Sequence, residues 1–95
     1  MNTFDKIAFK IVKEQELAIG SVAWQQASNV KGLVFNDDHT EILIGELENK
    51  QNVINNLVAS YEILFGKAAR QVCIEAVKSL VAELPLDDVP TTLQH

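Results

Sequence analysis

The side chains that could do chemistry are few, and three of them are adjacent. Asp37, Asp38 and His39 are all residue types that ligate metal ions. Asp is also typical of turns, because its side chain imitates a backbone hydrogen bond. Since no further His or Cys is spaced to complete a metal shell, we interpret this segment as a turn and expect no metal or cofactor. A regulatory site at the turn that responds to a metal or a small ligand is the alternative hypothesis.

Nucleophilic and acid–base groups are also sparse. The one cysteine, Cys73, lies in an apolar helical pattern, where a small buried thiol is expected, and only His39 and His95 could serve as its base. Glu16 and Glu62 each precede a glycine by four residues. We expect them to be solvated or to accept a backbone N–H, with general-acid chemistry as the alternative. Because no phosphate loop, serine elbow or HExxH helix occurs either, the sequence predicts a non-catalytic protein.

A candidate interaction surface lies on the first part of the chain. Lys6, Lys10 and Lys13 recur on one side of a predicted helix, and Phe9 falls outside the apolar stripe, close to them. Trp24 falls at the edge of the next apolar face, where we expect its indole to be partly wet. A solvated helix face would explain the lysines alone. As a contact surface, the aromatic residues would supply binding energy and the lysines would steer the encounter.

Two predicted helices, over residues 4–18 and 21–30, position this surface. Apolar residues recur at three- and four-residue spacing in the first, and Asn2 or Thr3 can cap it. Gly20 separates the two. One continuous kinked helix is the alternative, although Gly in mid-helix costs about 1 kcal/mol relative to Ala.

The same plan recurs 46 positions later, with Gly66 in place of Gly20. A helix capped by Asn49 or Asn52 precedes this glycine, and another helix follows it and ends near Leu84. The identical pairs at this offset are Glu16/Glu62, Gly20/Gly66, Ala23/Ala69 and Gln25/Gln71. The predicted buried stripe of the helix before Gly66 is Val53, Ile54, Leu57, Val58, Tyr61, Leu64 and Phe65. Alanines just after each glycine would let the two arms approach closely, so the repetition is first a packing device.

A β-hairpin is predicted between the two helical units. Residues 33–35 are apolar, and the β-branched segment 40–47 follows the turn. The predicted fold is therefore α+β and mostly helical, with two helix–Gly–helix units flanking a central hairpin. An all-α fold with an irregular central loop is the alternative. Residues 1–84 form the predicted globular domain, and residues 85–95, with two prolines, are expected to be disordered or to form an extended strap.

Composition narrows the class of protein. The 95 residues suffice for one core, and 47% hydrophobic with 22% charged residues is an ordinary globular balance. The longest apolar runs are too short to cross a membrane, and the N-terminus does not resemble a secretion signal. One cysteine excludes an internal disulfide, so a cytoplasmic protein is expected. The net charge of −5 disfavours phosphate backbones, so we expect no nucleic-acid partner, and DNA binding is the least favoured alternative.

The stretch LVASYEILFGKAARQVCIEAV, residues 57–77, resembles segments of small uncharacterised bacterial proteins, cyanobacterial ones in particular. This resemblance implies no activity and transfers no site residue. From the residues themselves, we expect a non-catalytic protein–protein interaction or adaptor module that self-associates or binds another protein. Its expected surface comprises Lys6, Phe9, Lys10, Lys13 and Trp24.

Overall fold

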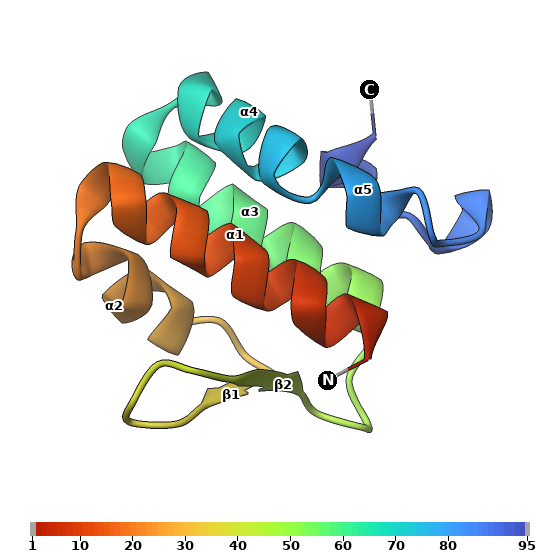
Figure 1. Ribbon diagram of the computed structural model, residues 1–95, viewed down its shortest axis with the longest axis horizontal. Coiled ribbons are helices and arrows are strands. Elements are labelled where there is room, and N and C mark those ends of the chain that lie inside the picture. Colours follow the sequence, from red (N-terminus) through yellow and green to blue (C-terminus); the bar gives the residue numbers. More distant parts are fainter. Residues whose placement is uncertain (1, 95) are drawn as a thin grey trace.

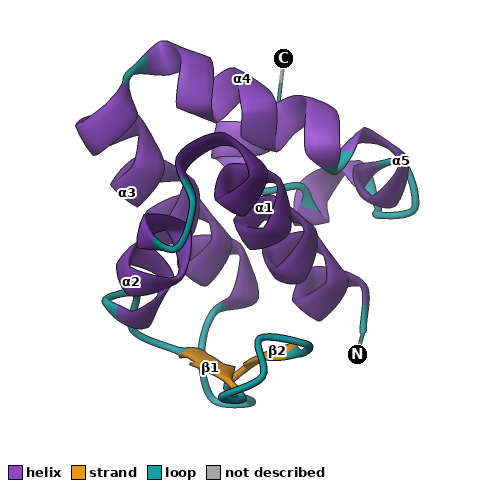
Figure 2. Ribbon diagram, turned by 60° about the vertical axis from the view of Figure 1, so that its left-hand side comes forward, coloured by secondary structure: helices purple, strands orange, loops and turns teal. Residues whose placement is uncertain are grey.

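Two long helices, α1 (Thr3–Ile19) and α3 (Lys50–Phe65), run side by side in the same direction through the middle of the molecule (Figure 1). The computed structural model describes residues 2–94, so Met1 and His95, one of the two histidines considered as a base for Cys73, lie outside the described residues. Helices α2 (Val22–Ser28) and α4 (Lys67–Ala76) lie on opposite sides of this central pair, and each contacts both of its members. The hairpin strands β1 (Leu33–Phe35) and β2 (Ile42–Ile44) cover the α2 side (Figure 2). The predicted α+β, mostly helical fold is confirmed.

Both long helices begin at an asparagine cap. Asn2 Oδ1 accepts from the N–H of Asp5 at 2.8 Å, and the Asp5 carboxylate accepts from the N–H of Asn2 at 3.3 Å. This reciprocal pair satisfies backbone donors that have no partner inside the helix. In α3, Asn49 Oδ1 accepts from Asn52 N–H at 3.0 Å, so Asn49 is the cap.

Each long helix ends at its glycine with the same geometry. Gly20 has φ 75° and Gly66 has φ 83°, in the region that L side chains rarely adopt. The glycine N–H donates to the carbonyl of Glu16 or Glu62, at 2.8 Å in both cases. The chain then reverses into the next helix, so the alternative of one continuous kinked helix is wrong at both sites. We call α1–Gly20–α2 the N-terminal unit and α3–Gly66–α4 the C-terminal unit.

The two units hold each other by matching buried hydrogen bonds. Gln15 Nε2 donates to the carbonyl of Ala69 at 2.9 Å, and Tyr61 Oη donates to the carbonyl of Ala23 at 2.7 Å. Gln15 and Tyr61 are 46 positions apart, as are Ala23 and Ala69. Each unit therefore donates to the first turn of the other unit's second helix, and the arrangement is approximately two-fold symmetric.

The hairpin is antiparallel and shorter than predicted. Leu33 pairs with Ile44, Val34 with Leu43 and Phe35 with Ile42. Alternation places Val34 and Leu43 on the outer face. The other four side chains pack on the helices, and the N–H of Ile44 donates to Asp5 Oδ1 of α1 at 2.9 Å. The hairpin is thus fastened to the N-terminal unit.

The chain after residue 76 differs from the prediction in two ways. The single predicted helix to Leu84 is broken at Val77, which is fully buried, and α5 (Lys78–Val81) follows. Neither Gly nor Pro marks this break, and the backbone of Val77 has φ −112° and ψ 10°. The segment after Pro85 forms two 3-10 turns, η1 (Leu86–Asp88) and η2 (Thr91–Leu93), and lies against α3 and α4.

The C-terminal segment is therefore a strap rather than a disordered tail. Val89, Pro90 and Leu93 are buried. Asn55 Oδ1 accepts from both the N–H and the hydroxyl of Thr92, at 3.0 and 2.7 Å. These three buried residues extend the core beyond the boundary predicted at residue 84. Among residues 2–94, no helix has the length and hydropathy needed to cross a membrane.

Candidate functional site

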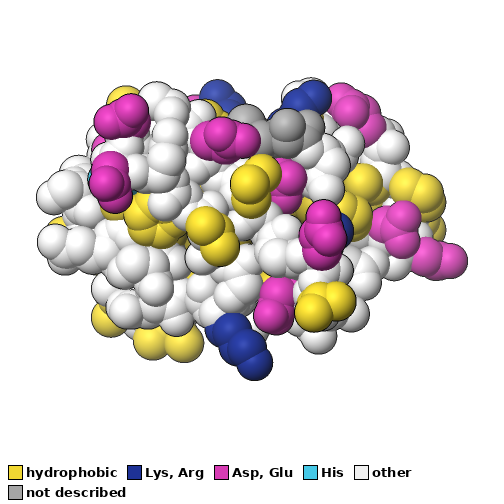
Figure 3. Space-filling view, turned by 90° about the horizontal axis from the view of Figure 1, so that it is seen from below, with side chains coloured by type: hydrophobic (Ala, Val, Ile, Leu, Met, Phe, Trp, Pro, Cys, Tyr) yellow, Lys and Arg dark blue, Asp and Glu magenta, His cyan; other side chains and the backbone are white. Residues whose placement is uncertain are grey.

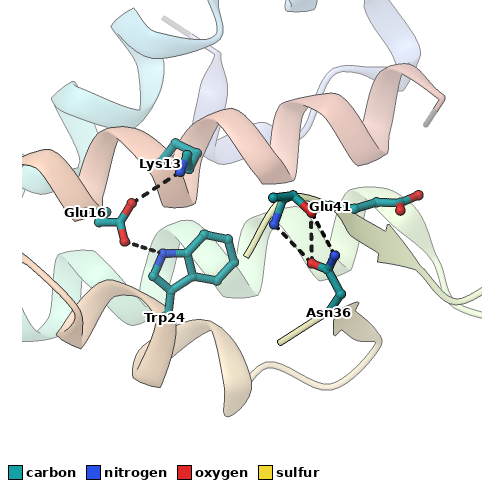
Figure 4. A network of polar contacts seen from close by, with 6 residues as sticks. Lys13, Glu16, Trp24, Asn36 and Glu41 are labelled. Atoms are coloured by element: carbon teal, nitrogen blue, oxygen red, sulfur yellow. Dashed lines mark hydrogen bonds and ion pairs between the residues drawn. The ribbon is translucent and has the colours of Figure 1, made fainter. Parts of the chain in front are cut away.

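Trp24 is a buried anchor of the hairpin. Its side chain is only 3% exposed, so the prediction of a partly wet edge residue is wrong. The His39 ring stacks on the indole with a centroid distance of 4.1 Å, and Phe35 meets it edge-on at 5.1 Å. Indole Nε1 donates to Glu16 Oε2 at 2.8 Å (Figure 4). Trp24 is covered because the hairpin folds back over α2, which helical periodicity alone does not reveal.

Asp37, Asp38 and His39, the residue types that could ligate a metal, lie in the turn of the hairpin. Asn36 Oδ1 accepts from the N–H groups of Thr40 and Glu41, at 3.0 and 3.2 Å (Figure 4). His39 has φ 56°, and its ring stacks on Trp24. Within residues 2–94, no three His, Cys, Asp or Glu side chains are close enough together to hold a metal ion.

The predicted lysine surface is only partly assembled. Lys10 Nζ lies 3.1 Å from Glu14 Oε1, and Lys13 Nζ lies 3.5 Å from Glu16 Oε1. These pairs neutralise much of the positive charge on the outer side of α1. Lys13 Nζ also lies 5.8 Å from the centre of the Phe9 ring.

Phe9 and Trp24 add little exposed aromatic area to the lysines. Phe9 is half-buried and packs on the core, and Trp24 belongs to the cluster under the hairpin. The exposed part of the predicted surface is therefore the α1 side that carries Lys6, Lys10 and part of Lys13. Leu17 continues this side four residues after Lys13, and sequence reasoning missed it.

Figure 1 places both glycine bends at the same end of the molecule, and large apolar residues close to each bend in the chain are exposed. Leu17 is 82% exposed and Ile63, its equivalent in the C-terminal unit, is 81% exposed. Leu64 and Phe65 were predicted to be buried, but both are exposed because α3 ends beyond the reach of the hairpin and the strap. We call this surface the bend end, and it comprises Leu17, Val22, Ile63, Leu64 and Phe65.

Two other surfaces have apolar character. Val34 and Leu43 lie side by side on the outer face of the hairpin, and Figure 3 shows separate apolar groups among acidic side chains on that side of the molecule. An open groove of about 700 Å³ lies between α1 and α4. Its apolar floor is Ala68, Val72 and Ala76, and the pair Lys10–Glu14 forms part of its wall.

The candidate nucleophile is a packing residue. Cys73 is fully buried, and Gln15 Nε2 lies 3.3 Å from its Sγ. Burial raises the pKa of the Cys73 thiol to about 11, and burial also raises the pKa of Tyr61. The thiol therefore stays protonated at neutral pH, which opposes nucleophilic chemistry.

Comparison of the chain with protein-family models, with curated proteins and with solved structures found no match.

Proposed function

We propose that this protein is a non-catalytic interaction module that binds another protein through the bend end. The observation that carries the proposal is that five large apolar residues within four positions of the two glycine bends are exposed, and that both bends lie at one end of the molecule. Several large exposed apolar side chains at one end of a small domain are typical of a contact site. Two of these residues, Leu17 and Ile63, occupy equivalent positions in the two units.

The surroundings of the bend end carry little net charge, which favours an apolar contact. The ion pairs of Lys10 and Lys13 leave little net charge on α1 near Leu17. Lys67, just after the second bend, is exposed. Binding energy would therefore come mainly from burial of the aliphatic side chains, at roughly 25 cal/mol per Å². The charged residues would influence the association rate more than the affinity.

Site-specific photocrosslinking in the source cell tests the proposal. A photoreactive amino acid at position 17 or 63 should capture a protein, whereas the same group at position 47 should not. Leu47 is a suitable control because it is fully exposed and lies outside the bend end.

The captured protein is then purified and titrated calorimetrically. The double variant Leu17→Ser/Ile63→Ser should weaken its binding by about tenfold or more, since each removes an apolar anchor. The matched variant Leu47→Ser/Leu86→Ser removes two leucines elsewhere that are at least about as exposed, and it should bind like the unmodified protein. Absence of a captured protein, or equal affinities for the two double variants, would contradict the proposal.

A further inference from the structure

The two outer edges of the hairpin are not equivalent. The N–H of Gly45 donates to the carbonyl of Gly32 at 2.9 Å, which identifies this pair as hydrogen-bonded across the ladder. Hydrogen-bonded and non-bonded pairs alternate in an antiparallel ladder. The backbone groups of Leu33 and Phe35 therefore point to the outer edge of β1, and those of Ile44 point to the outer edge of β2.

Helix α1 occupies the β2 edge, whereas the β1 edge is open. On β2, the N–H of Ile44 donates to Asp5 Oδ1 at 2.9 Å. On β1, the N–H of Leu33 makes a long 3.3 Å bond to the carbonyl of Val30 in the preceding turn. Within residues 2–94, no side chain or neighbouring element bonds to the backbone of Phe35. Such an edge is a template for pairing with another strand.

We propose that this edge pairs with the β1 edge of a second copy of the chain. The pairing is antiparallel and two-fold symmetric about Val34, and it joins the two hairpins into a four-stranded sheet. It adds a second surface to the proposed interaction module, separate from the bend end.

The register about Val34 uses the groups that point outward. Leu33 of each copy lies opposite Phe35 of the other, so each Phe35 N–H donates to a Leu33 carbonyl. Val34 lies opposite its own counterpart, and Leu43 flanks it on the same face. Val34 is 62% exposed in the single chain. The pairing would place it beside its counterpart and extend the apolar row of Leu43 and Val34 across both hairpins.

Charges at the two ends of β1 select a second copy as the occupant. Lys31 precedes the strand, and Asp37 follows it, and both are exposed. Antiparallel pairing about Val34 places Lys31 of one copy beside Asp37 of the other, twice by symmetry. Glu48 lies close to Gly32, the residue after Lys31, so its negative charge partly offsets that of Lys31 and reduces this attraction.

The dimer should be weak and reversible. The paired strand has three residues, and short edge strands limit association. Interfaces of small area are typical of transient contacts. We therefore expect a dissociation constant between micromolar and millimolar.

Sedimentation equilibrium of the full chain across that range is the first test. Val34→Lys places like charges together on the symmetry axis and should weaken the dimer by about tenfold or more. Leu43→Lys is the matched control, because it puts the same charge on the same outer face but away from the axis. Both positions are exposed, and circular dichroism checks that both variants keep the native fold. A monomer at all concentrations, or equal effects of the two variants, would overturn the proposal.

A charge exchange tests the register. Lys31→Glu should weaken the dimer several-fold, and adding Asp37→Lys to it should restore the association. Dilution monitored by NMR should shift the amide signal of Phe35 and leave that of Ile44 in place, since α1 already holds the latter. Failure of the exchange to restore association, or an unchanged Phe35 signal, would contradict the pairing.

The bend-end variant separates the two proposals. Leu17→Ser/Ile63→Ser should leave the dimer intact if the copies meet at β1. If this variant abolishes association while Val34→Lys does not, the copies meet at the bend end. In that case the sheet-edge proposal fails, and an interaction role for the bend end stands.

Discussion

The two helical units hold the segments that follow them at equivalent positions. Asp5 of the N-terminal unit accepts from the N–H of Ile44 in the hairpin, and Gln51, 46 positions later, donates to the carbonyl of Asp87 in the strap. The first bond is buried and the second is exposed. The same site on the helix therefore fastens a different segment in each unit, with the roles of donor and acceptor exchanged.

The second pair of equivalent positions differs more strongly. Trp24 packs its indole against two rings of the hairpin, whereas Arg70 donates through Nε to the carbonyl of Thr92 at 3.1 Å. At this position the N-terminal unit thus holds its covering segment through aromatic contact, and the C-terminal unit through a hydrogen bond to the backbone of the strap. The arrangement of helices that the two units share determines the positions at which a covering segment is held. The side chains at those positions determine the type of interaction that holds it.

Substitution of the equivalent residues Trp24 and Arg70 should give the largest difference in stability between the two units. Trp24→Ala empties a buried aromatic site and should lower the free energy of unfolding by about 3–5 kcal/mol. Arg70→Ala removes one partly buried hydrogen bond and should lower it by only about 1–2 kcal/mol. Urea denaturation measures both. Similar losses in the two variants would show that the two units are covered by interactions of equal strength.

Substitution of Gly20 and Gly66 should lower stability by similar amounts, in contrast to substitution of Trp24 and Arg70. Gly20→Ala and Gly66→Ala should each lower the free energy of unfolding by about 1–3 kcal/mol, because an L side chain is strained there. Apart from the two adjacent residues, nothing lies within 4 Å of an added Cβ at either site, so the loss reports backbone strain and not a clash.

A D-alanine control isolates this strain. At Gly20, φ 75° with ψ −154° is the mirror image of a relaxed extended conformation for an L residue. D-alanine introduced there by chemical synthesis should therefore leave stability unchanged or raise it slightly. Unequal effects of L-alanine at the two glycines would indicate that the bends do not share one geometry in solution.

The reciprocal hydrogen bonds should give the smallest effects. Tyr61→Phe leaves the carbonyl of Ala23 without its donor, and Gln15→Met does the same for Ala69. Each should lower the free energy of unfolding by about 1–2 kcal/mol. Thermal and urea unfolding of the two single variants and the double variant measure the losses and their additivity. A negligible loss in only one variant would show that the approximate symmetry is not energetically balanced.

Several elements could be predicted because their causes are local in the chain. The asparagine caps, the two glycine bends and the hairpin turn all depend on residues within a few positions of one another. The pairing of 33–35 with the second strand also followed from its apolar pattern. The break at Val77 had no such local signal and could not be predicted.

Exposure was harder to predict than backbone shape. Trp24 and Leu64 both belong to apolar patterns, yet the first is buried and the second is exposed. Periodicity gives the side of the helix on which a residue lies, but it does not say how far a covering segment extends. The C-terminal segment was left open between a strap and a disordered tail for the same reason, because its residues are buried only when it packs against α3 and α4.

The sequence alone determined the two helix–Gly–helix units, since a glycine with positive φ and a helix cap act within one or two turns of chain. Only the tertiary structure decided which apolar residues remain outside the core, and so where the bend end and the open β1 edge lie. Burial depends on contacts between segments far apart in the chain, and those contacts form only when the hairpin and the strap are in place.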